Sequence, residues 1–266
     1  MNRPIGVFDS GIGGLTVVRE LIRELPNEDI VYFGDTARVP YGTKSKATIL
    51  KFSLENVLFL SKFKVKLIVI ACNTSSALAL QELKRNFRVP ILGVIEPGAR
   101  AAVLKTKNKK IGVIGTSATI ASGAYEKAIK NIAKGARIFT QSCPLFVPLA
   151  EEGWTDNKVA DIVTQLYLKP LKNKGIDTLI LGCTHYPMFK NVIKKALGQG
   201  VALVDSAQEL AKEANALLRA KGLANKQKCA RKIEFYVSDE PLKFAHLGKK
   251  FLGRKIPSVK KANYNV

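Results

Sequence analysis

The sequence predicts an α/β fold with two pseudo-symmetric lobes, each a mainly parallel sheet flanked by helices, and a cleft between the lobes. Three observations predict this fold. Short runs rich in Val and Ile recur along the chain, amphipathic helical patterns lie between several of them, and two segments of the first half recur in the second half. Near-continuous apolar strands that alternate with helices are typical of a parallel sheet covered on both faces.

The expected strands are short, rich in β-branched residues and followed by turn signals. In chain order they are Ile5–Phe8, Ile30–Phe33, Leu67–Ala71, Ile91–Ile95, Ile111–Ile114, Arg137–Phe139, Thr178–Leu181, Ala202–Val204 and Ile233–Val237. The clearest helices are expected where the pattern is amphipathic or strongly helix-forming, at Leu15–Leu25, Ala47–Phe63, Tyr125–Ala133 and Ala207–Ala220. In such sheets ligands bind beyond the carboxyl ends of the strands, so the residues directly after each run are the first candidates for a binding site.

Two pairs of segments resemble each other in the same order along the chain. Ile5–Gly11 resembles Ile111–Ser117, and Ile68–Thr74 resembles Leu179–His185, with a cysteine at the same place in both members of the second pair. Short strings of Ile, Gly and Val recur by chance in parallel-sheet proteins. Two ordered pairs together indicate two copies of one α/β unit.

The duplication sets the expected domain limits. The boundary is placed at Glu96-Pro97-Gly98, where Pro and Gly are expected to break the pattern. Residues 1–96 then form the first lobe and residues 97–206 the second. We expect residues 207–266 to return to the first lobe.

Composition excludes several classes of protein. A hydrophobic content of 47% is too high for a disordered chain, and four Cys in 266 residues are too few for a disulfide scaffold. No apolar run is long enough to span a bilayer and no signal-peptide pattern is present, so we expect a cytoplasmic protein without membrane contact. The net charge of +22 attracts nucleic acid non-specifically. Because the lysines are scattered without interleaved aromatic residues, a solvated basic surface is preferred over a nucleic-acid site.

Cys72 and Cys183 are the strongest candidates for chemistry. Each directly follows an apolar run and precedes small polar residues that can cap a helix. A thiol near a helix N-terminus meets free N–H groups and the positive end of the dipole, which favour the thiolate. Most free cysteines are simply small buried hydrophobes. Equivalent placement in two repeated units favours a functional role here.

Three chemistries could use two such thiols. A redox pair would usually show Cys-x-x-Cys spacing, which is missing. A zinc site needs about four ligands, and only His185 lies near either cysteine in sequence, so no metal site is expected. The preferred chemistry is proton transfer, in which two thiols on opposite faces of one carbon remove and supply its proton.

Four motifs in order resemble the bacterial glutamate racemases, which belong to the cofactor-independent aspartate/glutamate racemase family. They are Asp9-Ser10-Gly-x-Gly-Gly, Val39-Pro40-Tyr41-Gly42, Ala71-Cys72-Asn73-Thr74 and Gly182-Cys183-Thr184-His185-Tyr186-Pro187. The resemblance implies interconversion of L- and D-glutamate without a cofactor, which supplies D-glutamate for peptidoglycan. A second copy of the chain is a candidate partner, although members of the family vary in dimer geometry and the resemblance therefore implies no particular assembly.

The same resemblance implies roles for individual residues. Cys72 and Cys183 would be the acid/base pair, with Asp9 assisting Cys72 and with Glu151 and His185 assisting Cys183. The substrate would contact residues of all four motifs and of the second repeat, namely Asp9, Ser10, Pro40, Tyr41, Gly42, Cys72, Asn73, Thr74, Thr116, Thr119, Cys183, Thr184 and His185. Hydroxyl and amide donors of this kind can bind carboxylates without an Arg clamp.

Two alternatives stay open at this point. An aspartate racemase would use the same chemistry on a side chain one methylene shorter, a difference worth only about 1–3 kcal/mol in a pocket. A basic nucleic-acid-binding protein on this fold belongs to a different class, and the net charge is its only support.

Overall fold

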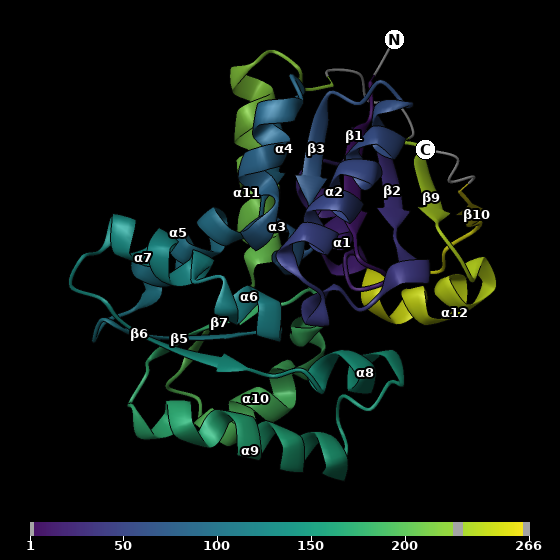
Figure 1. Cartoon of the computed structure of the whole chain (residues 1–266). Coiled ribbons are helices and arrows are strands. Elements are labelled where there is room, and N and C mark those ends of the chain that lie inside the picture. The colour runs from purple at the N-terminus through teal and green to yellow at the C-terminus, as the bar shows by residue number, and fades with distance from the viewer. Residues whose placement is uncertain (1–2, 226–230, 263–266) are drawn as a thin grey trace.

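The computed structural model describes residues 3–225 and 231–262 and contains two parallel sheets flanked by helices (Figure 1). The first sheet has the order β10-β9-β2-β1-β3-β4 and the second the order β6-β5-β7-β8. All the runs predicted as strands are confirmed, and only the short β10 was not foreseen. The strands are β1 (Ile5–Asp9), β2 (Ile30–Gly34), β3 (Leu67–Ile70), β4 (Ile91–Gly93), β5 (Lys110–Gly115), β6 (Arg137–Ser142), β7 (Thr178–Gly182), β8 (Ala202–Val204), β9 (Ile233–Val237) and β10 (Lys260–Lys261).

The helices alternate with the strands along the chain and cover both faces of each sheet. Figure 1 shows α9 and α10 on one side of the second sheet and α5, α6 and α7 on the other. The α-helices are α1 (Leu15–Glu24), α2 (Lys46–Ser61), α3 (Asn73–Leu78), α4 (Leu80–Asn86), α5 (Ile95–Lys105), α6 (Ser117–Ala121), α7 (Ala124–Ile132), α8 (Phe146–Glu151), α9 (Lys158–Asn173), α10 (Lys190–Leu197), α11 (Ser206–Ala220) and α12 (Pro241–Leu252). Three short 3-10 helices are η1 (Thr36–Arg38), η2 (Tyr41–Thr43) and η3 (Tyr186–Phe189).

The strand order repeats between the lobes. The order β2-β1-β3-β4 in the first sheet matches β6-β5-β7-β8 in the second, so β1 corresponds to β5 and β3 to β7. These are the strands that carry the two repeated sequence pairs. The predicted duplication is therefore visible in the topology.

Helices on both faces explain the unbroken apolar strands. All five residues of β1 are buried, and they contribute to two hydrophobic clusters. Ile5 and Val7 pack in the cluster that contains Leu21 of α1, whereas Phe8 packs in the one that contains Leu60 of α2. Full burial of each such side chain contributes about 1.5–3 kcal/mol, which holds the sheet between its helix layers.

The chain passes between the two sheets twice. The expected pattern break at Glu96-Pro97-Gly98 is wrong, because these residues form the first turn of α5. Proline is tolerated in a first turn since the N–H groups there have no acceptor within the helix. After β8 the chain continues through α11, and β9 then pairs with β2 of the first sheet. No helix within the described residues is long and apolar enough to cross a membrane.

Candidate active site

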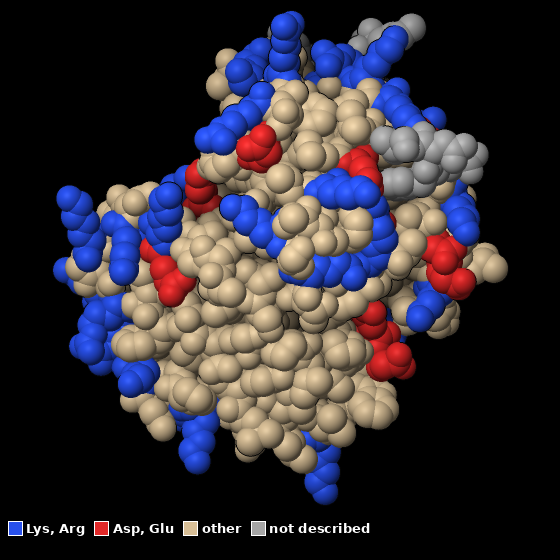
Figure 2. All heavy atoms as spheres, in the orientation of Figure 1, with Lys and Arg blue, Asp and Glu red and all other residues tan. Residues whose placement is uncertain are grey.

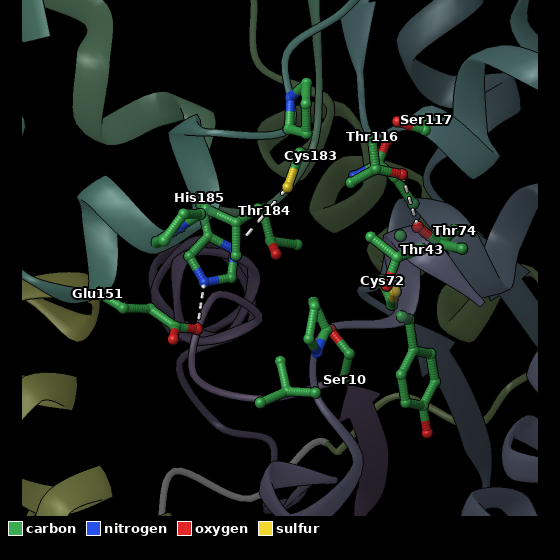
Figure 3. A pocket seen from close by; sticks show the side chains of 18 residues that line it. Ser10, Thr43, Cys72, Thr74, Thr116, Ser117, Glu151, Cys183, Thr184 and His185 are labelled. Atoms are coloured by element: carbon green, nitrogen blue, oxygen red, sulfur yellow. Dashed lines mark hydrogen bonds and ion pairs between the residues drawn. The ribbon is translucent and has the colours of Figure 1, made fainter.

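A cavity of about 300 Å³ lies at the carboxyl ends of the strands and is lined by both lobes (Figure 3). The first lobe contributes the residues after β1, β2 and β3, and the second contributes those after β5, β6 and β7. The lining residues are Ser10, Val39, Pro40, Tyr41, Gly42, Thr43, Cys72, Asn73, Thr74, Thr116, Ser117, Pro144, Val147, Pro148, Glu151, Cys183, Thr184 and His185. The cavity has the size of a small organic molecule such as an amino acid.

Cys72 and Cys183 both reach this cavity from equivalent strands. Cys72 occupies the N-cap position of α3 after β3, without a capping hydrogen bond from its side chain, and Cys183 directly follows β7. Their side chains are almost fully buried, and Figure 3 shows them projecting from different lobes toward a common space. The third described cysteine, Cys143, is buried and does not line the cavity, whereas Cys229 lies outside the described residues.

The surroundings of Cys72 hold its proton. Burial raises the pKa of this thiol to about 12, and the negative charge of Asp9 adds to the effect. Hydrogen bonds from Ser75 act in the opposite direction but are outweighed. The expectation that a helix N-terminus lowers the pKa of this thiol is therefore wrong for Cys72, because burial and a neighbouring carboxylate dominate over a short helix.

Cys183 has a different neighbour, the imidazole of His185. His185 Nδ1 lies 3.8 Å from Cys183 Sγ, and His185 Nε2 lies 3.1 Å from Glu151 Oε1. Burial lowers the pKa of His185, but the hydrogen bonds and charges of Cys183 and Glu151 outweigh it and raise the pKa to about 10. An imidazolium at neutral pH stabilises an adjacent thiolate. The two sulfurs thus lie in opposite electrostatic environments.

Asp9 lies behind the cavity wall and not in it. The carboxylate is fully buried at the end of β1, where Gly11 N–H donates to Oδ2 over 3.1 Å and the Thr184 hydroxyl donates to Oδ1 over 3.4 Å. Burial raises its pKa, opposed first by the charge of His185. Tyr32 donates to the Gly11 carbonyl over 2.6 Å and so fixes the same loop. Asp9 therefore contacts the cavity lining through Thr184, and its negative charge raises the pKa of Cys72.

Threonine hydroxyls join the lobes at the cavity. Thr74 Oγ1 in the first lobe lies 3.0 Å from Thr116 Oγ1 in the second and 3.3 Å from Thr119 Oγ1. Thr116 lines the cavity, whereas Thr119 lies behind it and bonds Thr116 over 2.9 Å. The lining residues include no Lys or Arg, and the two ring nitrogens of His185 contact Cys183 and Glu151, so neutral donors remain for a bound anion.

The structure brings most of the candidate residues together and adds others. Apart from Asp9 and Thr119, every residue predicted at the site lines the cavity. Sequence reasoning missed six lining residues, namely Val39, Thr43, Ser117, Pro144, Val147 and Pro148. Val39 belongs to a predicted motif, and Thr43 and Ser117 directly follow predicted site residues, but Pro144, Val147 and Pro148 form an apolar wall around α8 that has no signal in the sequence. No group of three or more His, Cys, Asp or Glu side chains in the described ranges is arranged to hold a metal ion.

Comparison with known proteins shows which family the chain resembles. The family model described as Asp/Glu/Hydantoin racemase matches residues 5–214. A glutamate racemase from Geobacter metallireducens is 52% identical over 257 residues, which cover 97% of this chain and 95% of that protein. The crystal structure of a glutamate racemase isoform from Bacillus anthracis matches with a TM-score of 0.94 and 42% identity, over 98% of this chain and 97% of that one. A glutamate racemase from Francisella tularensis, solved in complex with D-glutamate, matches with a TM-score of 0.92 and 43% identity, over 99% and 98% of the two chains. The chain belongs to the Asp/Glu/hydantoin racemase family.

Proposed function

We propose that this chain is an enzyme that interconverts L- and D-glutamate by moving the Cα proton between two thiols, and that it supplies D-glutamate for peptidoglycan. The observation that carries the proposal is that Cys72 and Cys183, from equivalent positions of two repeated lobes, face one cavity. The glutamate racemases that resemble the chain over nearly its whole length support the substrate. No cofactor is expected to be required.

The reaction needs one thiolate and one thiol at the same time. We propose that Cys183, beside the imidazolium of His185, starts as the thiolate, whereas Cys72 keeps its proton. The Cys183 thiolate takes the proton from Cα, and the electron pair of the broken C–H bond stays on Cα, delocalised into the α-carboxylate. The Cys72 thiol then gives its proton to the opposite face of Cα, which inverts the stereocentre. The opposite enantiomer reacts by the reverse sequence, which starts from the form in which Cys72 has lost its proton and Cys183 holds one.

The neutral donors of the cavity are proposed to hold the two carboxylates of the substrate. Ser10, Asn73, Thr74, Thr116 and Thr184 supply hydroxyl and amide groups on the wall. Such donors can also stabilise the negative charge that develops on the α-carboxylate as the proton leaves. Glu151 is proposed to hold His185 in its charged form, and Asp9 to act through its charge near Cys72.

A polarimetric or circular dichroism assay tests this function. Purified protein with no added cofactor is expected to bring the signal of either D- or L-glutamate to zero, because the product at equilibrium is the racemic mixture. Aspartate is the control substrate. Faster turnover of aspartate than of glutamate would favour the aspartate racemase alternative, and an unchanged signal with both amino acids would refute the proposed activity. A salt-dependent gel shift with DNA that survives Cys72→Ser would favour nucleic-acid binding instead.

We also propose that a second copy of the chain covers an apolar stripe on α9. Val159, Ile162 and Leu166 are 40%, 56% and 70% exposed, and their spacing places them along one side of the helix. Leu145 and Trp154 are also exposed large apolar residues close to the ends of α8. Figure 2 shows a broad, mostly uncharged surface over the lobe that contains α8 and α9, with Lys and Arg gathered toward the edges. In a chain of net charge +22, two copies repel least across such a face, and a two-fold interface sets the same patch against itself.

Leu166→Glu is expected to convert a dimer into a monomer, because it buries two carboxylates in the proposed interface. Light scattering coupled to size-exclusion chromatography measures the mass. Leu104→Glu is the matched control, since Leu104 is 86% exposed on α5, outside this stripe. A wild-type protein that is monomeric at micromolar concentration, or a Leu166→Glu variant that stays dimeric, would contradict this interface.

A further inference from the structure

Tyr125 lies at the junction of the lobes, next to the cavity but outside its lining. It belongs to the first turn of α7 and is 2% exposed. Its hydroxyl lies 2.7 Å from Asn73 Oδ1 in the first lobe and 3.2 Å from Ser206 Oγ at the start of α11. Its ring packs so close to Gly98 and Gly182 that a Cβ on either glycine would lie 3.1–3.3 Å from a ring carbon. The phenol thus has a fixed position among four separate segments of the chain.

The hydrogen-bonding capacity of these groups fixes the direction of each bond. The Tyr125 hydroxyl has one proton, and the amide oxygen of Asn73 can only accept, so Tyr125 donates to Asn73 Oδ1. Ser206 must then donate to the Tyr125 oxygen. Burial raises the pKa of Tyr125, which keeps the phenol protonated and able to donate.

The orientation of the Asn73 amide decides what the cavity offers to a ligand. Asn73 lines the cavity beside Cys72 and Thr74. With Oδ1 engaged by Tyr125, the two N–H groups of Nδ2 remain for the ligand. The flipped amide would instead present an oxygen acceptor, which repels a carboxylate.

We propose that Tyr125 is a positioning residue for substrate binding: its hydroxyl, reaching across the lobe junction, holds the Asn73 amide with its N–H groups toward the substrate carboxylates. The inference rests on the proposed racemase function and deepens it. Tyr125 of the second lobe thus orients the Asn73 amide, a binding group of the first lobe. Tyr125 itself touches neither the cavity nor the reacting atoms.

Tyr125→Phe tests the proposal, because phenylalanine keeps the ring and removes only the hydroxyl. The variant is expected to raise KM for glutamate by about three- to tenfold, the range of one net hydrogen bond, and to change kcat by less than about twofold. KM is expected to change more than kcat because the variant alters a binding group and leaves the two thiols in place. Tyr236→Phe is the matched control, since the Tyr236 hydroxyl bonds Glu234 on β9 in the other lobe. Thermal unfolding of both variants checks that the fold is retained.

A double-mutant cycle with Asn73→Ala separates positioning from packing. If Tyr125 acts through Asn73, Tyr125→Phe changes KM in the wild type but has no further effect in the Asn73→Ala background. Equal effects of Tyr125→Phe in both backgrounds would show that the hydroxyl acts through packing and would overturn the inference. So would Ser206→Ala with the same effect as Tyr125→Phe, because that variant leaves the bond to Asn73 in place. Wild-type protein without racemase activity would instead refute the proposed function, so the two failures are distinct.

Discussion

Cys72→Ser and Cys183→Ser are each expected to lower glutamate racemisation by about 10²–10⁴-fold, the contribution of a positioned acid or base. A hydroxyl is far less acidic than a thiol, so serine can neither form the base at neutral pH nor readily give up a proton. Each variant keeps the other cysteine, and that cysteine still reaches one face of Cα. Each variant is therefore expected to retain exchange of the Cα hydrogen with solvent for one enantiomer, and the two variants for opposite enantiomers. The exchange is expected to be slower in Cys183→Ser, because burial and Asp9 hold the proton on Cys72.

The exchange is measured by mass spectrometry or proton NMR of D- and L-glutamate incubated separately in heavy water. Cys143→Ala is the matched control, because Cys143 is buried in the same lobe as Cys183 but does not line the cavity. Alkylation by iodoacetamide adds a second test, since excess glutamate should protect the wild type. Wild-type racemisation rates in both serine variants would exclude the two-thiol mechanism.

His185→Asn is expected to lower kcat/KM for glutamate by about 10²-fold, because it removes the imidazole that contacts Cys183 and is proposed to favour proton removal there. Racemisation has an equilibrium constant of one, so kcat/KM must fall equally for the two enantiomers. The two enantiomers are instead expected to differ in the deuterium isotope effect at Cα. Proton transfer at Cys183 becomes the slower step, and deuterium at Cα should slow one enantiomer more than the other. Equal isotope effects for both enantiomers would contradict the assignment of His185 to Cys183.

The same pair predicts a pH dependence with a definite sign. His185 has a pKa of about 10, raised in part by Glu151, so activity is expected to fall as the pH rises through about 10 and the imidazolium loses its proton. Glu151→Gln removes a negative charge that favours the imidazolium, which lowers the pKa of His185 and moves this fall to lower pH. Titration of the substrate amine is the same for both proteins, so the difference between the two pH profiles reports on the enzyme. Superimposable profiles would count against a charged His185.

Local sequence patterns were sufficient to predict much of the fold. Each apolar run from Ile5–Phe8 to Ile233–Val237 forms a strand, and the central strands β1, β2, β3 and β7 are buried throughout, which requires continuous apolar residues. The two cysteines could be predicted to face one cleft because each follows the equivalent strand of a repeated lobe, and ligands bind beyond the carboxyl ends of parallel strands. In contrast, Pro97 and Gly98 do not break the pattern as expected, since proline is tolerated in the first turn of a helix, where its missing N–H costs no hydrogen bond.

The sequence by itself determined which residues could carry the chemistry: two thiols at equivalent strand ends, with hydroxyl, amide, imidazole and carboxylate groups beside them. Only the tertiary structure decided the electrostatic surroundings and the orientation of these groups. Burial and Asp9 keep the proton on Cys72, the contact between Glu151 and His185 places a cation beside Cys183, and Tyr125 reaches Asn73 from the other lobe. These effects depend on desolvation and on contacts between residues far apart in the chain, and neither quantity is encoded in local composition or periodicity.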